Sequence, residues 1–234
     1  MRIAAIADLH CRVGEEETIK KILNEIDREA DVLVLAGDLT DNGLPAELEI
    51  LLAELKKLQK PVVAVLGNHD HEGGHSEELT QMLDEAGVHI LEGTAIEING
   101  VGFGGTKGFC GGFESFLIQP FGESALKKFI KASIDEAVNL ENALAKLNCD
   151  YKFAVLHYSP IKETLVGESS ELFPFLGCSR LENALDRQKV NIAVHGHAHH
   201  GSPSGLTAGK VPVHNVSRFV QSQHTGKPYC IIEV

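Results

Sequence analysis

The sequence predicts an α/β protein with one parallel β-sheet and a second, mixed sheet. Two observations predict the parallel sheet. Short apolar runs alternate with stretches of helical periodicity, and polar residues follow several of these runs directly. A third observation predicts the mixed sheet, because after residue 88 the chain changes to short alternating segments separated by Gly and Asn.

The first part of the chain predicts two consecutive β-α-β units. Residues 3–7, 32–36 and 62–66 are apolar runs typical of strands buried on both faces. Residues 15–28 and 45–58 lie between them and place apolar side chains at helical spacing. Two such crossovers in succession indicate neighbouring parallel strands.

The second part predicts shorter strands and two further helices. Three short segments favour antiparallel or mixed pairing in a second sheet: 89–91, 95–98 and 101–104. Six further segments follow: helices over 124–146 and 180–188, and strands at 152–156, 190–194, 211–216 and 229–234. Residues 161–178 are polar and irregular, and we interpret them as a lid segment. No linker or repeat divides the chain, so we expect residues 1–234 to form a single domain.

The composition indicates an acidic globular protein. The chain has 21 Lys and Arg against 33 Asp and Glu, a net charge of −12, and 43% hydrophobic residues. This charge disfavours long nucleic acids as partners, since their binding rests largely on Lys and Arg. No apolar stretch approaches the roughly 20 residues of a membrane span, and the first strand is too short for the apolar core of a signal peptide. We therefore expect a cytoplasmic location and no membrane partner, and the oligomeric state stays open.

Polar side chains that can bind metals follow the ends of five predicted strands. They are Asp8-Leu9-His10, Gly37-Asp38, Gly67-Asn68-His69-Asp70, His157 and Gly196-His197-Ala198-His199. Strand ends of this kind meet at one edge of a sheet. Taken singly, such residues are more often helix caps, turn residues or surface histidines. Taken together, their mixed nitrogen and oxygen donors suit two cations that share one carboxylate, and they predict a metal-centred hydrolytic site.

Other polar features near these motifs are interpreted as structural. The five cysteines lack a C-x-x-C pair and are expected to be reduced thiols, with Cys11 a packed neighbour of His10 rather than a ligand. Asp41 is expected to cap a turn or support a ligand, with direct ligation as the alternative. Residues 100–112 are glycine-rich but lack the G-x-G-x-x-G of dinucleotide sites. The remaining candidate histidines are expected to be structural or on the surface: His71, His75, His195, His200 and His214.

The strand-end motifs resemble those of the calcineurin-like metallophosphoesterases, which read D-x-H, G-D, G-N-H-D/E, H and G-H-x-H in this order. The resemblance runs from Asp8 to His199. It implies a two-sheet mixed β-sandwich flanked by helices, in four layers α/β/β/α. It also implies two divalent ions, one held by Asp8, His10, Asp38 and His199, and the other by Asp38, Asn68, His157 and His197. We expect Mn²⁺, with Fe, Zn, Ni, Co or Mg as alternatives, because mixed N/O ligands do not decide among these ions.

Such a centre suits the hydrolysis of phosphoesters. Two ions about 3.5–4 Å apart would bind phosphate oxygens and hold a bridging hydroxide for in-line attack. His69 is not needed as a ligand, so we predict that it protonates the leaving alkoxide, with Asp70 fixing its tautomer. The resemblance implies the same role for His69.

The predicted function is therefore that of a binuclear metallophosphoesterase acting on a small phosphodiester or phosphomonoester, including nucleotides. No arginine lies beside Gly67-Asn68-His69-Asp70, which disfavours a protein substrate. The alternatives are a nuclease of the same superfamily, which the acidic net charge disfavours, and a non-catalytic scaffold, which the intact ligand set disfavours.

Overall fold

The chain folds into two mixed sheets flanked by helices, which confirms the predicted fold class. The computed structural model describes residues 1–234. Its first sheet has five strands in the order β11-β1-β2-β3-β4. Their bounds are Cys230–Glu233, Arg2–Ile6, Val32–Ala36, Val62–Val65 and Val88–Ile90. The strands β1 to β4 run parallel, and β11 pairs antiparallel with β1.

The second sheet has six strands in the order β5-β6-β7-β8-β10-β9. Their bounds are Thr94–Ile98, Val101–Gly105, Tyr151–Val155, Ile192–His195, Pro212–Asn215 and Ser204–Leu206. The four central strands, β6, β7, β8 and β10, run parallel, while β5 and β9 lie antiparallel at the two edges. Helices α4 (Ser124–Ala145) and α6 (Ser179–Arg187) cross over between β6, β7 and β8, whereas β9 lies in the connection between β8 and β10.

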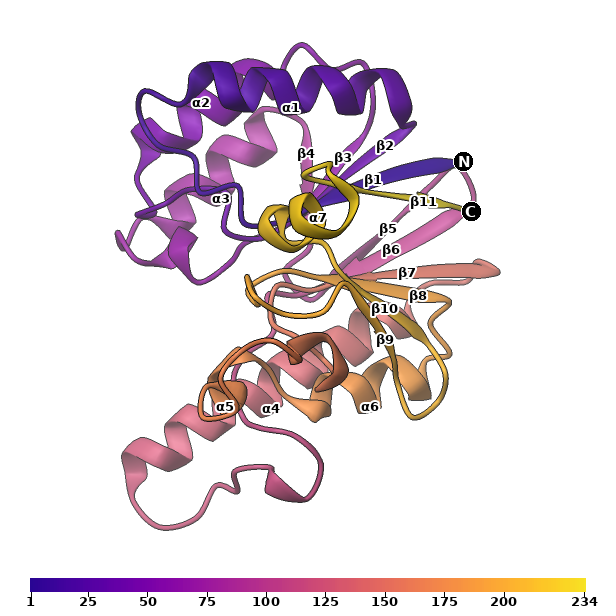
Figure 1. The fold of residues 1–234 in the computed structure, drawn as a ribbon. Helices are drawn as coiled ribbons and strands as arrows, with labels where there is room; N and C mark the ends of the chain where they lie inside the picture. Colours follow the sequence, from indigo (N-terminus) through magenta and orange to yellow (C-terminus); the bar gives the residue numbers. More distant parts are fainter.

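Helices cover the outer faces of both sheets (Figure 1). On the first sheet these are α1 (Glu16–Glu29), α2 (Pro45–Leu55) and α3 (Ser76–Glu85), and on the second α4 and α6. Two shorter helices, α5 (Phe173–Leu176) and α7 (Arg218–Thr225), lie near the ends of the strands. None of the helices combines the length and the apolar character that crossing a membrane requires.

The side chains of β1 point alternately to its two faces and pack against the layers on both sides. Ile3 and Ala5 face the apolar cluster between the two sheets, whereas Ala4 and Ile6 face the cluster beneath α1, α2 and α3. This is the period-two pattern of a strand, and all four residues are fully buried, so the strand reads as one apolar run. A third cluster lies between the second sheet and α4 and α6.

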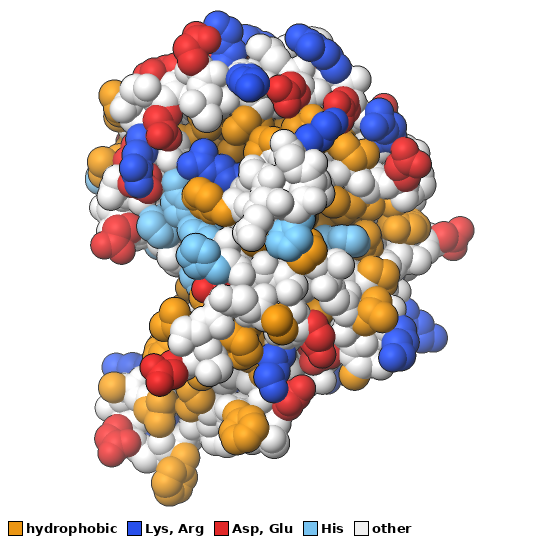
Figure 2. All heavy atoms as spheres, in the orientation of Figure 1, with side chains coloured by type: hydrophobic (Ala, Val, Ile, Leu, Met, Phe, Trp, Pro, Cys, Tyr) orange, Lys and Arg blue, Asp and Glu red, His pale blue; other side chains and the backbone are white.

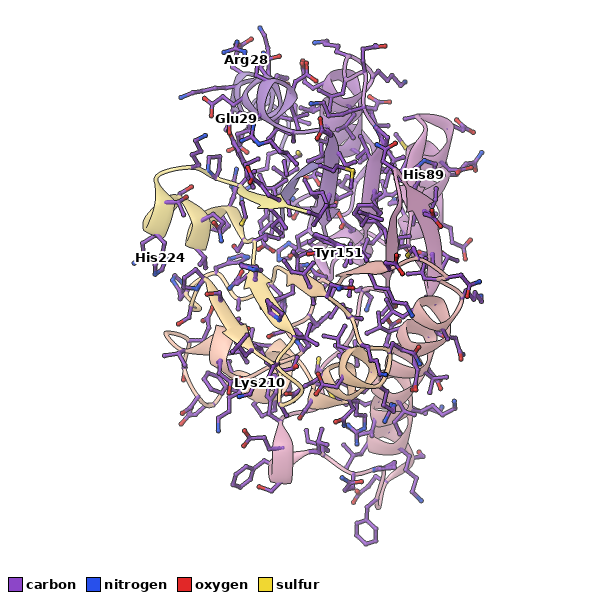
Figure 3. All side chains as sticks on the ribbon, turned by 90° about the vertical axis from the view of Figure 1, so that its right-hand side faces the viewer. Arg28, Glu29, His89, Tyr151, Lys210 and His224 are labelled. Atoms are coloured by element: carbon purple, nitrogen blue, oxygen red, sulfur yellow. The ribbon has the colours of Figure 1, made fainter.

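Figure 3 views this stack from the side where both chain termini lie. Tyr151, which packs against the cluster between the sheets, appears midway between Arg28 on α1 and Lys210 beyond β9. The two sheets therefore form the inner layers and the helices the outer layers.

Two parts of the secondary-structure prediction were wrong or incomplete. The segment at 89–91 was expected to share the mixed pairing of the second sheet, but β4 is the parallel edge strand of the first sheet. The reason is α3, which we did not predict and which makes a third crossover between β3 and β4. Helix α7 was also missed, and it lies directly beside the candidate site.

Candidate metal centre

The loops that follow β1, β2, β7 and β8 bring two groups of potential ligands to one place. The donor atoms of the first group, Asp8, His10, Asp38 and His199, lie within 4.8 Å of one another, and so do those of the second, Asp38, His157 and His197. Figure 2 shows a group of histidine side chains on the left of this face, and further histidines lie separately near its middle. Asp38 belongs to both groups.

The carboxylate of Asp38 faces the two groups with different oxygens. Its Oδ2 lies 3.7 Å from His10 Nε2, and its Oδ1 lies 3.3 Å from His157 Nε2. Burial by itself would raise the pKa of Asp38, but the neighbouring His157 outweighs it and holds this pKa below its usual value. Asp38 is therefore an ionised carboxylate between two sets of donors, which is the position of a bridging ligand.

The first group brings the nitrogens of two histidines close to each other. His10 Nε2 and His199 Nε2 face each other at 3.4 Å, and His10 Nδ1 is buried without a hydrogen-bond partner. Burial lowers the pKa of His10 to about 4, so its ring is neutral at pH 7. His199 Nε2 also lies 3.5 Å from Asp8 Oδ1. Imidazole and carboxylate donors around one point fit a borderline divalent cation.

The second group contains the fully buried His157, whereas His197 is half-buried. His157 Nδ1 donates to the Ala36 carbonyl at 3.0 Å, which turns Nε2 toward Asn68 Oδ1, also at 3.0 Å. Burial by itself would lower the pKa of His157, but Asp38 raises it to about 9. A cation between these donors would displace the proton on Nε2, as metal binding to histidine requires. A histidine whose other nitrogen is bonded to a carbonyl is typical of metal sites.

Four predicted ligands have a backbone conformation that side chains rarely adopt. Asp8, His10, Asp38 and His197 have φ values of 58°, 43°, 51° and 68°. Left-handed conformations in residues other than glycine cost free energy and cluster at functional sites. Here each lies at a sharp turn directly after a strand, so the turn aims the side chain into the centre.

Two glycines of the sequence motifs are needed because side chains approach them closely. A Cβ at Gly37, which has a φ of +88°, would overlap the His157 ring. A Cβ at Gly67 would overlap the Asp38 carboxylate. The glycine before each ligand motif therefore leaves room for a ligand from another loop.

The structure corrects the predicted role of Asp70. We expected its carboxylate to hold the His69 ring, and this was wrong. Asp70 is fully buried and accepts hydrogen bonds of 2.7–3.2 Å from three loop residues, Leu39, Thr40 and Gly67. Residues 69–71 form one 3₁₀ turn, so adjacent side chains point in different directions. Asp70 ties the loop after β2 to the loop after β3.

The His69 ring is oriented by a backbone carbonyl instead. His69 Nδ1 lies 2.6 Å from the carbonyl oxygen of Asp41, and a carbonyl can only accept, so Nδ1 carries a proton. The ring packs edge-on against His10, with 4.4 Å between the centroids. His69 Nε2 is therefore the nitrogen left for substrate.

Asp41 lies beside the centre, where its donor atoms and those of His10 and His69 form a third group within 4.8 Å of one another, so its supporting role stays a prediction. Its Oδ1 lies 3.5 Å from His10 Nδ1, and Arg12 binds its carboxylate at 2.9–3.0 Å. Arg12 holds the pKa of Asp41 below its usual value. The sequence analysis missed Arg12, although its position two residues after His10 was a usable signal.

Phe219 is a further neighbour that the sequence analysis missed. Its ring lies 4.6 Å from that of His199 and 6.2 Å from that of His10, and it is partly exposed. Phe219 comes from α7, a helix without a strand-end motif, so no signal in the sequence pointed to it.

The residues interpreted as structural behave as such where the contacts can be traced. Cys11 is buried in the cluster beneath α1, and burial raises the pKa of its thiol to about 12. His195 is buried, with its nitrogens 2.8 Å from Thr164 Oγ1 and from the Gly196 carbonyl.

The segment 161–178, predicted to be a lid, contacts the centre where the Phe175 carbonyl lies 3.3 Å from His197 Nε2. Its action as a lid stays a prediction.

Comparison with known proteins identifies the family. A model of the calcineurin-like phosphoesterases matches residues 1–201. This chain belongs to the calcineurin-like phosphoesterases. Members of this family hydrolyse phosphoric esters with divalent metals, so the chain is a metal-dependent phosphoric ester hydrolase, and the predicted family and reaction class are confirmed.

The relatives of this calcineurin-like phosphoesterase include two bacterial proteins named as probable cyclic nucleotide phosphodiesterases. One, from Synechococcus sp., is 34% identical over 80 residues, which cover 30% of this chain and only 31% of the relative. The other, from Vesicomyosocius okutanii, is 26% identical over 189 residues, which cover 80% of this chain and 70% of the relative. Among solved structures, the phosphopantetheinyl hydrolase of Mycobacterium tuberculosis has a TM-score of 0.69 at 17% identity, covering 98% of this chain and 95% of the other, and so shares the fold.

Proposed function

We propose that this chain hydrolyses a small phosphodiester of the nucleotide class at a centre of two divalent ions, with Mn²⁺ as the favoured metal. The observation that carries the proposal is the double contact of Asp38, whose two oxygens face different histidines. The names of two relatives support a cyclic nucleotide as the substrate class. The net charge of −12 further favours a small substrate over a long nucleic acid.

The ligand sets follow from the two groups of donors. We assign Asp8, His10, Asp38 and His199 to one ion, and Asp38, Asn68, His157 and His197 to the other. When bound, two such ions supply positive charge for the phosphate oxygens and make water a stronger nucleophile at neutral pH. The chain itself keeps the donors in place through the Ala36 carbonyl on His157 and the backbone N–H of His197 on Asp8.

His69 is proposed as the residue that gives a proton to the leaving oxygen. Its Nδ1–H is bound to the Asp41 carbonyl, so a proton donor here must be the imidazolium form, which gives the proton on Nε2 to the leaving oxygen and becomes the neutral ring with Nδ1–H. The ring lies against His10, a proposed ligand of the ion that His199 would share. Asp70 acts as a positioning residue, because it fastens the loops that carry Asp38 and His69.

The experiment is hydrolysis by the purified, Mn²⁺-loaded protein of bis(p-nitrophenyl) phosphate and of p-nitrophenyl phosphate. We expect turnover of both, with the diester preferred, and loss of turnover after metal removal. His199→Ala is expected to abolish most activity, while His75→Ala leaves it unchanged, because His75 contacts only Glu78 on an exposed surface. Absence of hydrolysis with two ions bound per chain would contradict the proposal.

A further inference from the structure

A cavity of about 300 Å³ is lined by residues of the loop that carries Asn68 and of a loop that is hydrogen-bonded to His157. Four parts of the fold line it. Leu66 and His71 come from the loop after β3, Leu91 and Glu92 from the turn after β4, Thr106 and Lys107 from the loop after β6, and Glu136 and Asn139 from α4. The backbone carbonyl of Lys107 accepts the N–H groups of His157 and Tyr158, both at 3.0 Å, so this loop is joined directly to the loop that carries a proposed ligand.

Lys107 is the one cation in this lining without an anionic partner. Its Nζ makes no ion pair within 4 Å, and its single hydrogen bond goes to the Gly108 carbonyl at 3.3 Å. The ammonium group lies 5.0 Å from the centroid of Phe109 and 5.4 Å from that of Tyr158. Aromatic faces of this kind hold a cation in place without neutralising its charge.

The nearby carboxylate of Glu136 forms hydrogen bonds with residues on both sides of Lys107. It accepts the hydroxyl of Thr106 and the backbone N–H of Gly108, the latter at 2.9 Å. These bonds fix the residues on both sides of Lys107 to α4. Glu136 therefore positions the loop and makes no ion pair with the ammonium group of Lys107.

We propose that Lys107 binds an anionic oxygen of the substrate's phosphate group from the cavity beside the metal centre. The inference rests on the proposed function, because it takes the phosphoester to lie at the two ions. A lysine is a point charge well suited to phosphate, and a half-buried ammonium beside aromatic rings interacts more strongly with an anion than an exposed one. Lys107 would thus supply the cationic contact that no arginine provides next to Gly67-Asn68-His69-Asp70.

The test is the binding of inorganic phosphate to the Mn²⁺-loaded protein, measured by calorimetry. Lys107→Met keeps the apolar stem that packs on Phe109 and Tyr158 while it removes the charge. We expect this variant to bind phosphate at least about tenfold more weakly, with unchanged metal content. Lys107→Arg is expected to stay within about threefold of the wild type, because it keeps the charge. The matched control is Lys131→Met, which makes the same change at an exposed ion pair on α4.

A second measurement uses only the wild-type protein and does not depend on how the variants fold. Amine acetylation is followed by mass spectrometry with and without phosphate. Phosphate is expected to protect Lys107 several-fold and to leave Lys131 unprotected. The proposal is overturned if Lys107→Met binds phosphate as the wild type does, if Lys131→Met weakens binding equally, or if phosphate does not protect Lys107. Failure of the wild type to hydrolyse any ester would instead contradict the proposed function, which these binding data do not measure.

Discussion

The two halves of the centre differ in the exposure of one histidine each, and we name them the enclosed half, with His157, and the open half, with His199. In the half that contains His157, the side chain of this histidine is 0% exposed and both of its nitrogens face fixed oxygen acceptors. In the half that contains His199, the side chain is 33% exposed, and the His10 and His199 nitrogens face each other without a proton donor fixed between them. In the enclosed half, hydrogen bonds within the protein fix the orientation of His157. In the open half, we expect a bound ion to fix the orientation of His199.

The difference in exposure between His157 and His199 follows from their positions relative to the strands that precede them. His157 and His197 follow central strands of the second sheet, and the Ala36 carbonyl that orients His157 belongs to the first sheet. Packing of the two sheets therefore fixes this half before any ligand binds. His199 lies two residues further from its strand and touches Phe219 of α7, at the surface. We expect the enclosed half to bind its ion more tightly and the open half to receive the substrate.

The largest expected effect on turnover comes from changing Asp38, the residue that belongs to both halves. Asp38→Asn removes a charge that both donor groups use, so both ions should bind more weakly. Turnover should fall by about a thousandfold or more, since metal stabilisation of the transition state is worth several kcal/mol. Turnover and metal content of Asp38→Asn would be compared with those of Asp84→Asn, an exposed aspartate on α3. Full occupancy of one site in Asp38→Asn would show that the carboxylate is not shared.

The next prediction separates the halves by the order in which they lose their ions. Titration of the loaded wild-type protein with a chelator should release two ions in two steps, with the open half first. His199→Ala should remove the early step alone, while His157→Ala should remove the late one. A single step in the wild type, or the opposite assignment, would contradict the comparison.

His69→Ala tests the proton donor beside the open half. Removal of a positioned general acid costs typically about 10²–10⁴-fold, and the cost falls on esters with poor leaving groups. We expect this loss on an alkyl phosphodiester and a much smaller loss on bis(p-nitrophenyl) phosphate, with two ions retained. Equal losses on both esters would count against proton donation by His69.

The smallest expected effect is a difference in pH dependence between the halves of the metal-free protein. Asp38 raises the pKa of His157 to about 9, so the stability from this contact is full below about 6.5 and is lost as the pH rises through 9. Burial lowers the pKa of His10 to about 4, so its contribution is full above about 6.5 and is lost as the pH falls toward 4.

Urea denaturation at pH 5, 7 and 9.5 would measure the free energy of unfolding on the acid limb, below pH 7, and on the alkaline limb, above pH 7. His157→Gln should flatten the alkaline limb and His10→Gln the acid limb, each leaving the other limb in place. Identical profiles for the two variants would remove the electrostatic distinction between the halves.

The parts that the sequence predicted are those fixed by local patterns. Runs such as 32–36 are apolar on both faces, so their burial in a parallel sheet follows directly, and polar residues after such runs must lie at its edge. The grouping of Asp8, Asp38 and His157 could therefore be expected before the structure was known.

The errors concern side-chain directions and elements without a pattern. Asp70 follows His69 in sequence, yet the 3₁₀ turn sends its carboxylate to the backbone of Thr40. Phe219 contacts His199 from a segment with no metal-binding motif, and only the packing of α7 brings it there. The loop of Lys107, which is hydrogen-bonded to His157, has no such motif either. Contacts of this kind depend on tertiary structure and leave no periodic signal in the sequence.

The most direct test of the central claim is a crystal structure of the Mn²⁺-loaded protein with anomalous diffraction at the manganese edge. The account predicts two anomalous peaks about 3.5–4 Å apart, with Oδ1 of Asp38 on the peak beside His157 and Oδ2 on the peak beside His10. One peak, or two peaks of which Asp38 contacts only one, would contradict the account.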